Sequence, residues 1–114
     1  MKVIRRGEVW LAELGPTRGR EQAGERLVLV VSADPINQSA TELVVAVPLT
    51  TRRRGVPTHV EVRPPAGGSP DVSFAMCEQL RSLSAERLGS RPFGSVPASV
   101  LSSVQDRLRL LFGL

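Results

Sequence analysis

Short apolar runs separated by polar segments dominate the chain. Residues 27–33, LVLVVSA, begin with five consecutive aliphatic residues, and residues 43–49, LVVAVPL, form a second such run. Runs of this length are typical of strands buried on both faces and are too short for a helix. Residues 58–64, THVEVRP, alternate between valine and polar residues. This alternation predicts a half-exposed strand with His59 on its solvent face.

The segments between these runs carry weaker patterns. Residues 7–14, GEVWLAEL, are rich in β-forming residues and predict a strand. The next segment, residues 17–26, is too polar and too rich in glycine for a strand and predicts a loop. The other segments predict a turn or short helix at 33–42, a turn at 64–70, one bent strand or two short strands at 71–83, and a helical turn and loop at 84–96.

Residues 97–112 show the clearest helical period. Apolar residues recur three or four positions apart, polar residues fill the opposite face, and Pro97 suits the first turn. A helix of about 16 residues spans about 24 Å, so its apolar face must pack on a sheet or on a second subunit. The apolar positions are Val100, Leu101, Val104, Leu108, Leu111 and Phe112.

Together these elements predict a mostly β fold of the α+β class. Five or six short strands, long polar loops and one C-terminal helix suggest a small antiparallel barrel that the helix caps. The length of 114 residues is that of one domain, and residues 1–114 contain no internal repeat and no linker.

Composition excludes several classes of protein. No apolar run approaches the roughly 18 residues needed to span a bilayer, and no apolar signal region follows the N-terminus. We therefore expect a cytoplasmic protein with no membrane partner. Cys77 is the only cysteine, which excludes an internal disulfide and a cysteine-built zinc site. A nucleophilic Cys77 would need His59 as its base, and the two lie on separate segments, so we expect a partly buried structural thiol.

The chain is basic, and its positive charge is almost entirely arginine. Fifteen Lys and Arg residues oppose eleven Asp and Glu residues, which gives a net charge of +4, and Lys2 is the only lysine. Arginine binds phosphates in a bidentate manner, although a genome rich in G and C favours arginine codons as well. Three arginines at 52–54 follow Thr50 and Thr51 at a predicted strand end. They indicate either a solvated loop or a phosphate-binding rim.

The familiar motifs of catalysis are absent from the sequence. It contains no GxxxxGK[ST], HExxH or GxSxG, it has a single histidine, and its carboxylates do not form a magnesium-binding cluster. We therefore expect no metal or other cofactor. RNA can still be cut, because its own 2′-hydroxyl can attack the adjacent phosphorus. An arginine and a hydroxyl could stabilise the charge, and Glu21 or Glu78 could take the proton.

Four segments carry a resemblance to a known family. The segments RGEVWLAELGPTRGREQAGER, LVLVVSAD, VAVPLTT and DVSFAMCEQLRSL resemble the MazF/PemK (Kid) toxin endoribonucleases of type II toxin–antitoxin systems. The resemblance implies an SH3-like barrel, a homodimer, and metal-independent cleavage of single-stranded RNA to 2′,3′-cyclic phosphate and 5′-hydroxyl ends. It also implies a cognate antitoxin that blocks the RNA groove.

The resemblance also implies the site residues. The family's catalytic arginine and threonine fall on Arg26 and Thr50. The residues with an implied supporting or RNA-binding role are Glu21, Gln22, Thr51, Arg52, Arg53, Arg54, Glu78, Gln79 and Arg81. The sequence departs from the family pattern at three positions: Leu27 replaces a proline, Glu78 replaces an aspartate, and Met76 replaces an arginine that helps the chemistry in some members.

Two other functions remain open from the sequence. Gyrase-inhibiting toxins share the barrel and cleave nothing themselves, because a fold alone does not determine function. A catalytically inactive module that binds RNA or the antitoxin is the second alternative, and Met76 favours it. Trp10 could stack on an RNA base, although its position within a strand favours the core.

Overall fold

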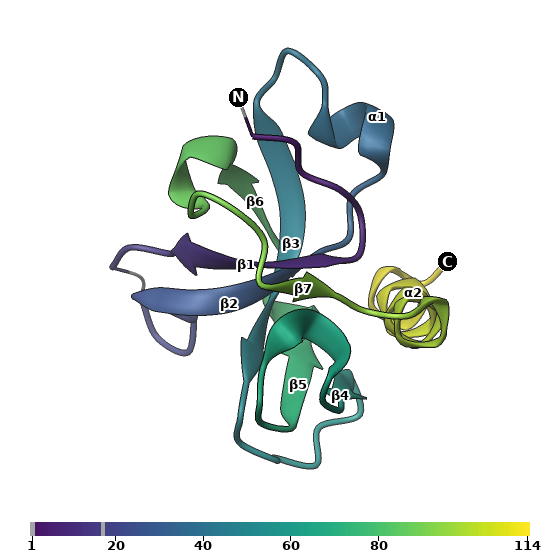
Figure 1. Ribbon diagram of the computed structural model, residues 1–114. Coiled ribbons are helices and arrows are strands. Elements are labelled where there is room, and N and C mark those ends of the chain that lie inside the picture. The colour runs from purple at the N-terminus through teal and green to yellow at the C-terminus, as the bar shows by residue number, and fades with distance from the viewer. Residues whose placement is uncertain (1, 17) are drawn as a thin grey trace.

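One curled antiparallel sheet forms the body of the molecule (Figure 1). The structure is a computed structural model that describes residues 2–16 and 18–114, so Thr17 of the predicted loop lies outside the described residues. The strands are β1 (Glu8–Glu13), β2 (Glu25–Val30), β3 (Leu43–Thr50), β4 (His59–Val62), β5 (Ser73–Met76), β6 (Arg81–Ser84) and β7 (Gly94–Ser95). The order β4-β5-β3-β2-β1-β7 runs across the sheet, and β6 pairs with β3 off this path.

Strand β3 organises the sheet because three strands pair with it. Its first half pairs with β6, its middle pairs with β2, and its last two residues, Leu49 and Thr50, pair with β5. Between β5 and β6 the chain makes the 3-10 turn η2 (Cys77–Gln79). Of the two alternatives for residues 71–83, two short strands are therefore confirmed.

The central strands are buried on both faces, as their apolar runs predicted. Val9, Leu29 and Val47 lie in one core cluster. Their sequence neighbours Trp10 and Val28 lie in the other. Trp10 is 1% exposed, which confirms its predicted core position.

The predicted C-terminal helix is present as α2 (Ala98–Phe112) and packs on one side of the sheet (Figure 1). Val104 is buried at 1% exposure, and Val100, Leu101 and Leu108 pack on the same core cluster. In the last turn Leu111 and Phe112 are exposed, so this part of the apolar face does not pack on the sheet. The remaining helical segments are α1 (Asp34–Asn37), η1 (Ala66–Gly68) and η3 (Ala85–Arg87).

Three local predictions were wrong. Arg26 belongs to β2 and not to a loop, because β2 begins at Glu25, where it pairs with β1. His59 does not face solvent: its side chain is 5% exposed, because α2 and η2 pack against β4. The segment at 84–96 was predicted as a helical turn and a loop, but it also contains the two-residue strand β7, which forms by pairing with β1.

Candidate active site

Arg26 and Thr50 lie on neighbouring strands in the same register. The paired residues of β2 and β3 are Val28 with Pro48, Leu29 with Val47, and Val30 with Ala46. The pairing ends at Val28 and Pro48, and the same register extended by two residues would set Arg26 opposite Thr50. Residues opposite each other in an antiparallel pair project from the same face of the sheet. The sheet thus brings together two residues that lie 24 positions apart in the sequence.

The Thr50 side chain is held in one orientation. Thr50 is the last residue of β3 and is 6% exposed. Its Oγ1 accepts a hydrogen bond of 3.2 Å from the backbone N–H of Arg52. A hydroxyl that accepts in this way keeps its own proton for donation to another group.

Arg26 presents a donor that the described protein groups do not use. The residue is half-buried, and its Nε is buried without a hydrogen-bond partner among the described residues. Leaving a buried donor unpaired costs about 1–3 kcal/mol, and a guanidinium forms its strongest hydrogen bonds with anions. The side chain is therefore suited to an anionic ligand.

A hollow of about 290 Å³ gathers most of the predicted supporting residues. Pro48, which precedes Thr50 by two positions and so projects from the same face of β3, forms part of its wall. Two of the lining residues are held by hydrogen bonds to the backbone. Gln79 Nε2 donates to the Arg20 carbonyl at 3.1 Å, and Arg81 donates to the Leu14 carbonyl at 3.4 Å. The lining residues are Glu21, Gln22, Pro48, Glu78, Gln79, Leu80 and Arg81.

Both carboxylate oxygens of Glu78 are occupied. Thr58 Oγ1 donates to Oε1 at 2.7 Å, and His59 Nε2 lies 2.7 Å from Oε2. Burial raises the pKa of Glu78, but the hydrogen bonds from Thr58 and His59 outweigh burial and lower the pKa below its ordinary value. A carboxylate in this state is a poor proton acceptor. This contact could not be predicted from the sequence, because His59 reaches Glu78 only through the pairing of β4 with β5.

Glu21 differs from Glu78 in its surroundings. It is exposed, on the loop between β1 and β2, and its Oε1 accepts a hydrogen bond of 3.1 Å from the Arg18 backbone N–H. That bond holds the residue at the rim of the hollow.

The three arginines after Thr50 are not equivalent. Arg53 binds Glu61 at 2.6 Å, and its guanidinium lies 4.8 Å from the centre of the Phe74 ring. Hydrogen bonds from Arg63 and Arg53 lower the pKa of Glu61. Arg52 and Arg54 have no side-chain partner within residues 2–16 and 18–114. Thr51 and all three arginines are exposed and lie outside the lining of the hollow.

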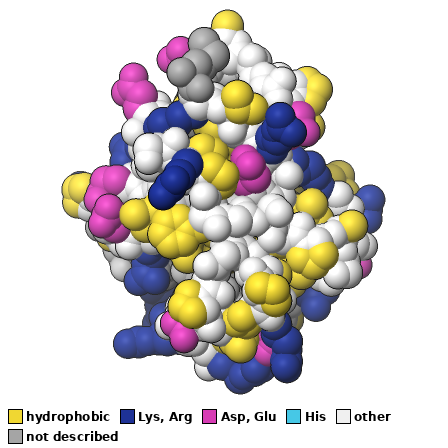
Figure 2. All heavy atoms as spheres, viewed as in Figure 1, with side chains coloured by type: hydrophobic (Ala, Val, Ile, Leu, Met, Phe, Trp, Pro, Cys, Tyr) yellow, Lys and Arg dark blue, Asp and Glu magenta, His cyan; other side chains and the backbone are white. Residues whose placement is uncertain are grey.

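Basic side chains gather near this loop. Figure 2 shows Lys and Arg side chains at the lower end of the molecule, where Figure 1 places the connection between β3 and β4. The loop at 51–57 that holds Arg52, Arg53 and Arg54 forms this connection. The chain therefore places positive charge directly after Thr50.

Cys77 is not a nucleophile. The residue is 0% exposed, and burial raises the pKa of its thiol to about 11. The fold brings its segment beside that of His59, because the Cys77 N–H donates to the Thr58 carbonyl at 3.3 Å. The sulfur itself donates to the Ala75 carbonyl at 3.9 Å. A thiol that stays protonated is inert.

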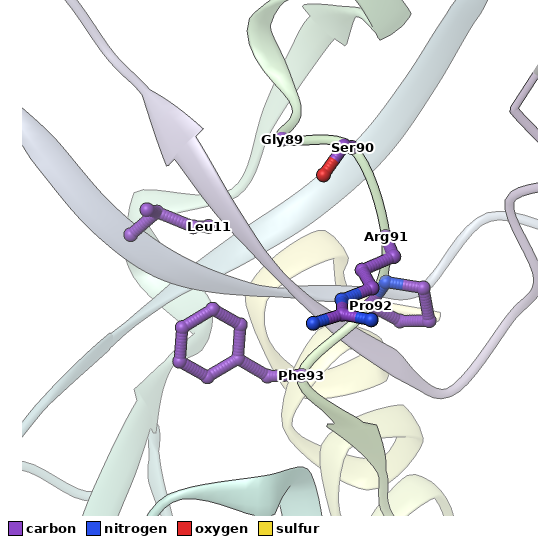
Figure 3. A pocket seen from close by; sticks show the side chains of 6 residues that line it. All are labelled: Leu11, Gly89, Ser90, Arg91, Pro92 and Phe93. Carbon is purple, nitrogen blue, oxygen red and sulfur yellow. The ribbon is translucent and has the colours of Figure 1, made fainter.

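A larger hollow of about 640 Å³ lies elsewhere, over β1 (Figure 3). Leu11 and the loop from Gly89 to Phe93 form its walls. Leu11 alternates with Ala12, which pairs with Arg26, so Leu11 projects from the opposite face of the strand. This hollow is therefore not part of the arrangement around Arg26 and Thr50.

The structure contains neither a metal-binding cluster nor a membrane-spanning helix within the described residues. Within residues 2–16 and 18–114, no group of three or more His, Cys, Asp or Glu side chains is arranged to hold a metal ion. In the same part of the chain, no helix has the length and apolar character required to cross a membrane.

The fold and the site define a class of small, mostly β proteins in which a curled antiparallel sheet and a C-terminal helix support an arginine–threonine pair beside a hollow. The chain belongs to the PemK-like, MazF-like toxins of type II toxin–antitoxin systems, since the model of that family matches residues 5–112.

Individual relatives agree with this assignment. The chain is 37% identical to endoribonuclease MazF9 of Mycobacterium tuberculosis over 95% of each chain. It is 37% identical to endoribonuclease EndoA of Bacillus subtilis, over 98% of this chain and 97% of that one. Among solved structures, MazF of Deinococcus radiodurans superposes with a TM-score of 0.86 at 30% identity over the whole of both chains. A mycobacterial endoribonuclease in complex with its cognate antitoxin gives 0.80 at 30% identity, over 97% of this chain and 96% of that one.

Proposed function

We propose that this protein is a toxin endoribonuclease that cuts single-stranded RNA without a metal ion. The 2′-hydroxyl attacks the adjacent phosphorus, the bond to the 5′-oxygen breaks, and the products carry a 2′,3′-cyclic phosphate and a 5′-hydroxyl. The observation that carries this proposal is the pairing of β2 with β3, whose register, extended by two residues, would set Arg26 opposite Thr50 on the face where Pro48 lines the hollow with Glu21 and Gln79.

The two catalytic residues stabilise the charge of the transition state. Arg26 directs an unpaired guanidinium donor at the non-bridging oxygens of the phosphate. Thr50 donates its hydroxyl proton to the same group, since its lone pair already accepts from Arg52. Donors that are fixed before the reaction are worth about 10²- to 10³-fold in rate.

Glu21 is the general base in this proposal. Its carboxylate takes the proton of the 2′-hydroxyl, and the leaving 5′-oxygen takes up a proton from water. Glu78 is the poorer candidate, because Thr58 and His59 hold both of its oxygens and keep its pKa low. Gln22, Gln79 and Arg81 line the path of the RNA, and Thr51, Arg52 and Arg54 hold its phosphates beyond Thr50.

The protein acts in the cytoplasm, where its RNA substrate is found, and its activity is controlled by a cognate antitoxin. An antitoxin segment with acidic residues would match the arginines at 52–54 and compete with RNA for the hollow. Two copies of the chain associate through surface that includes the exposed apolar end of α2, where Leu110 is 66% and Phe112 is 62% exposed. Sedimentation of wild type and Phe112→Asp tests this, and an equal mass for the two would contradict it.

The decisive experiment maps the ends of cut RNA. Purified protein is incubated with end-labelled single-stranded RNA in excess EDTA. We expect cyclic-phosphate ends from wild type, and none from Arg26→Ala or Thr50→Val. Arg91→Ala, which removes an exposed arginine at the other hollow, is the matched control and keeps wild-type cleavage. Intact RNA together with gyrase-dependent breaks in DNA would replace the proposal with the gyrase-inhibitor alternative.

A further inference from the structure

The His59 side chain makes a single directional contact. It is 5% exposed, and its Nε2 lies 2.7 Å from Glu78 Oε2. Its Nδ1 is buried and has no hydrogen-bond partner among the described residues. Since Glu78 is a carboxylate, the proton of the ring lies on Nε2, and the ring donates to Glu78. Arg107 of α2 does not compete for Glu78, because its Nε donates to the Pro57 carbonyl at 2.8 Å.

Glu78 connects this histidine to the hollow. It is the middle residue of η2 and lines the hollow together with Gln79. Gln79 donates to the Arg20 carbonyl, which precedes Glu21 by one position. Two hydrogen bonds, joined by the backbone of η2 between Glu78 and Gln79, thus connect His59 with the loop that carries Glu21.

We propose that His59 is a positioning residue for the RNA-cleaving site, which acts by holding Glu78 and through it sets η2 and the loop that carries Glu21. This inference rests on the proposed function. The role belongs to the Nε2–H donor and not to the imidazole ring as such. Loss of the donor frees Glu78 and η2, so Glu21 moves relative to Arg26 while the phosphate contacts persist. A misplacement of about 1 Å in a catalytic group lowers the rate by up to about 10²-fold.

Two amide variants separate the donor from the ring. In His59→Gln the side-chain amide nitrogen lies at the position of Nε2 and can still donate to Glu78. In His59→Asn the amide lies nearer the backbone, at the position of Nδ1, and cannot reach. Both variants place an uncharged amide in the same surroundings, so they match in polarity.

The cleavage test compares kcat with RNA affinity. We expect His59→Asn to lower kcat about tenfold and His59→Gln to stay within about threefold of wild type. Binding of a 2′-fluoro analogue of the same RNA, which lacks the attacking hydroxyl, should change less than about threefold in both variants. Equal kcat for the two variants, whether high or low, would overturn the inference, provided that thermal melting shows both folded.

A double-mutant cycle tests the route through Glu78. If His59 acts through Glu78, then Glu78→Gln lowers kcat to a similar degree, and the combination with His59→Asn adds little to either change. Additive effects would overturn the route. Glu78→Gln is an exposed, near-isosteric change, so it keeps the test available if His59→Asn does not fold.

Hydrogen exchange separates this inference from the proposed function. The backbone amides at 18–24 and 77–80 should exchange faster in His59→Asn than in His59→Gln, whether or not the protein cuts RNA. If wild type cuts no RNA but the loop is loosened in this way, the proposed function fails and the positioning role stands. Equal exchange in both variants would overturn the positioning role even if the wild type cuts RNA.

Discussion

The hydroxyl and the methyl group of Thr50 have different roles: the hydroxyl forms hydrogen bonds and the methyl group packs. The residue is buried at 6% exposure, so its methyl group packs in the protein while its Oγ1 receives the Arg52 N–H. In the proposed mechanism, the chemistry depends on the hydroxyl alone. Serine retains the hydroxyl, whereas valine retains the shape.

Substitutions at Thr50 should therefore divide by chemistry and not by size. We expect Thr50→Ser to keep kcat within about tenfold of wild type and Thr50→Val to lower it by about 10²-fold or more, because a fixed donor to the transition state is lost. Single-turnover cleavage of a labelled RNA measures both. A valine variant as active as the serine variant would show that the hydroxyl takes no part.

The two carboxylates at the hollow should differ in their effect on cleavage. Glu21→Gln removes the proposed base, so we expect a loss of about 10²-fold in kcat. Glu78→Gln should reduce kcat by about tenfold, because in this proposal Glu78 acts only on position. Single-turnover cleavage measures both, and a larger loss in Glu78→Gln than in Glu21→Gln would reverse the two assignments.

At the scale of the elements, local periodicity determined what the sequence could predict. The apolar runs of β2 and β3 and the helical repeat of α2 were predicted because each depends on neighbours a few residues away. The position of His59 was not, because its burial depends on α2 and η2. The same holds for the proximity of Arg26 and Thr50, which the resemblance implied by role but only the β2–β3 register explains.

Helix α2 should contribute to stability mainly through its buried face. We expect Val104→Ala to lower the free energy of unfolding by about 2 kcal/mol, because it leaves a cavity under the helix. Gln105→Ala, at an exposed position of the same helix, should change it by less than about 0.5 kcal/mol. Urea unfolding followed by circular dichroism measures both, and similar losses would mean that α2 packs through a different face.

The contact of η2 with β4 should make stability depend on pH. The pKa of Glu78 is lower in the folded protein than its ordinary value of 4.5, since Thr58 and His59 donate to the carboxylate. The folded state therefore binds the proton less readily than the unfolded state, so the stabilisation is complete above about pH 4.5 and is lost as the pH falls through the folded pKa. Melting temperatures between pH 3 and pH 6 should fall less steeply for Glu78→Gln, and an unchanged slope would count against this link.

At the scale of the whole molecule, positive charge is concentrated in the loop at 51–57, next to the proposed site. A net charge of +4 is modest, but Arg52, Arg53 and Arg54 follow directly after the proposed site. Two of them are unpaired among the described residues, while Arg53 is bound to Glu61. The effective charge facing RNA is therefore smaller than the count of arginines suggests.

This distribution makes the salt dependence of RNA binding specific to position. Arg54→Ala should weaken binding and reduce the slope of log affinity against log salt by about 0.7, because one fewer counterion is released from single-stranded RNA. Arg53→Ala should change the slope less, since Glu61 already neutralises part of its charge. Titrations of the 2′-fluoro RNA at several salt concentrations give the slopes, and equal slopes for the two variants would contradict the pairing.

The buried thiol of Cys77 can report local opening of the folded protein. Because the sulfur is fully enclosed and its pKa is about 11, a thiol-specific dye cannot react with it while β5 and η2 stay in place. The rate of labelling in native buffer thus reports how often this part of the sheet opens, and no other cysteine contributes to the signal. RNA or antitoxin that covers η2 would lower the rate at which Cys77 is labelled. The labelling rate therefore reports ligand contact at the hollow.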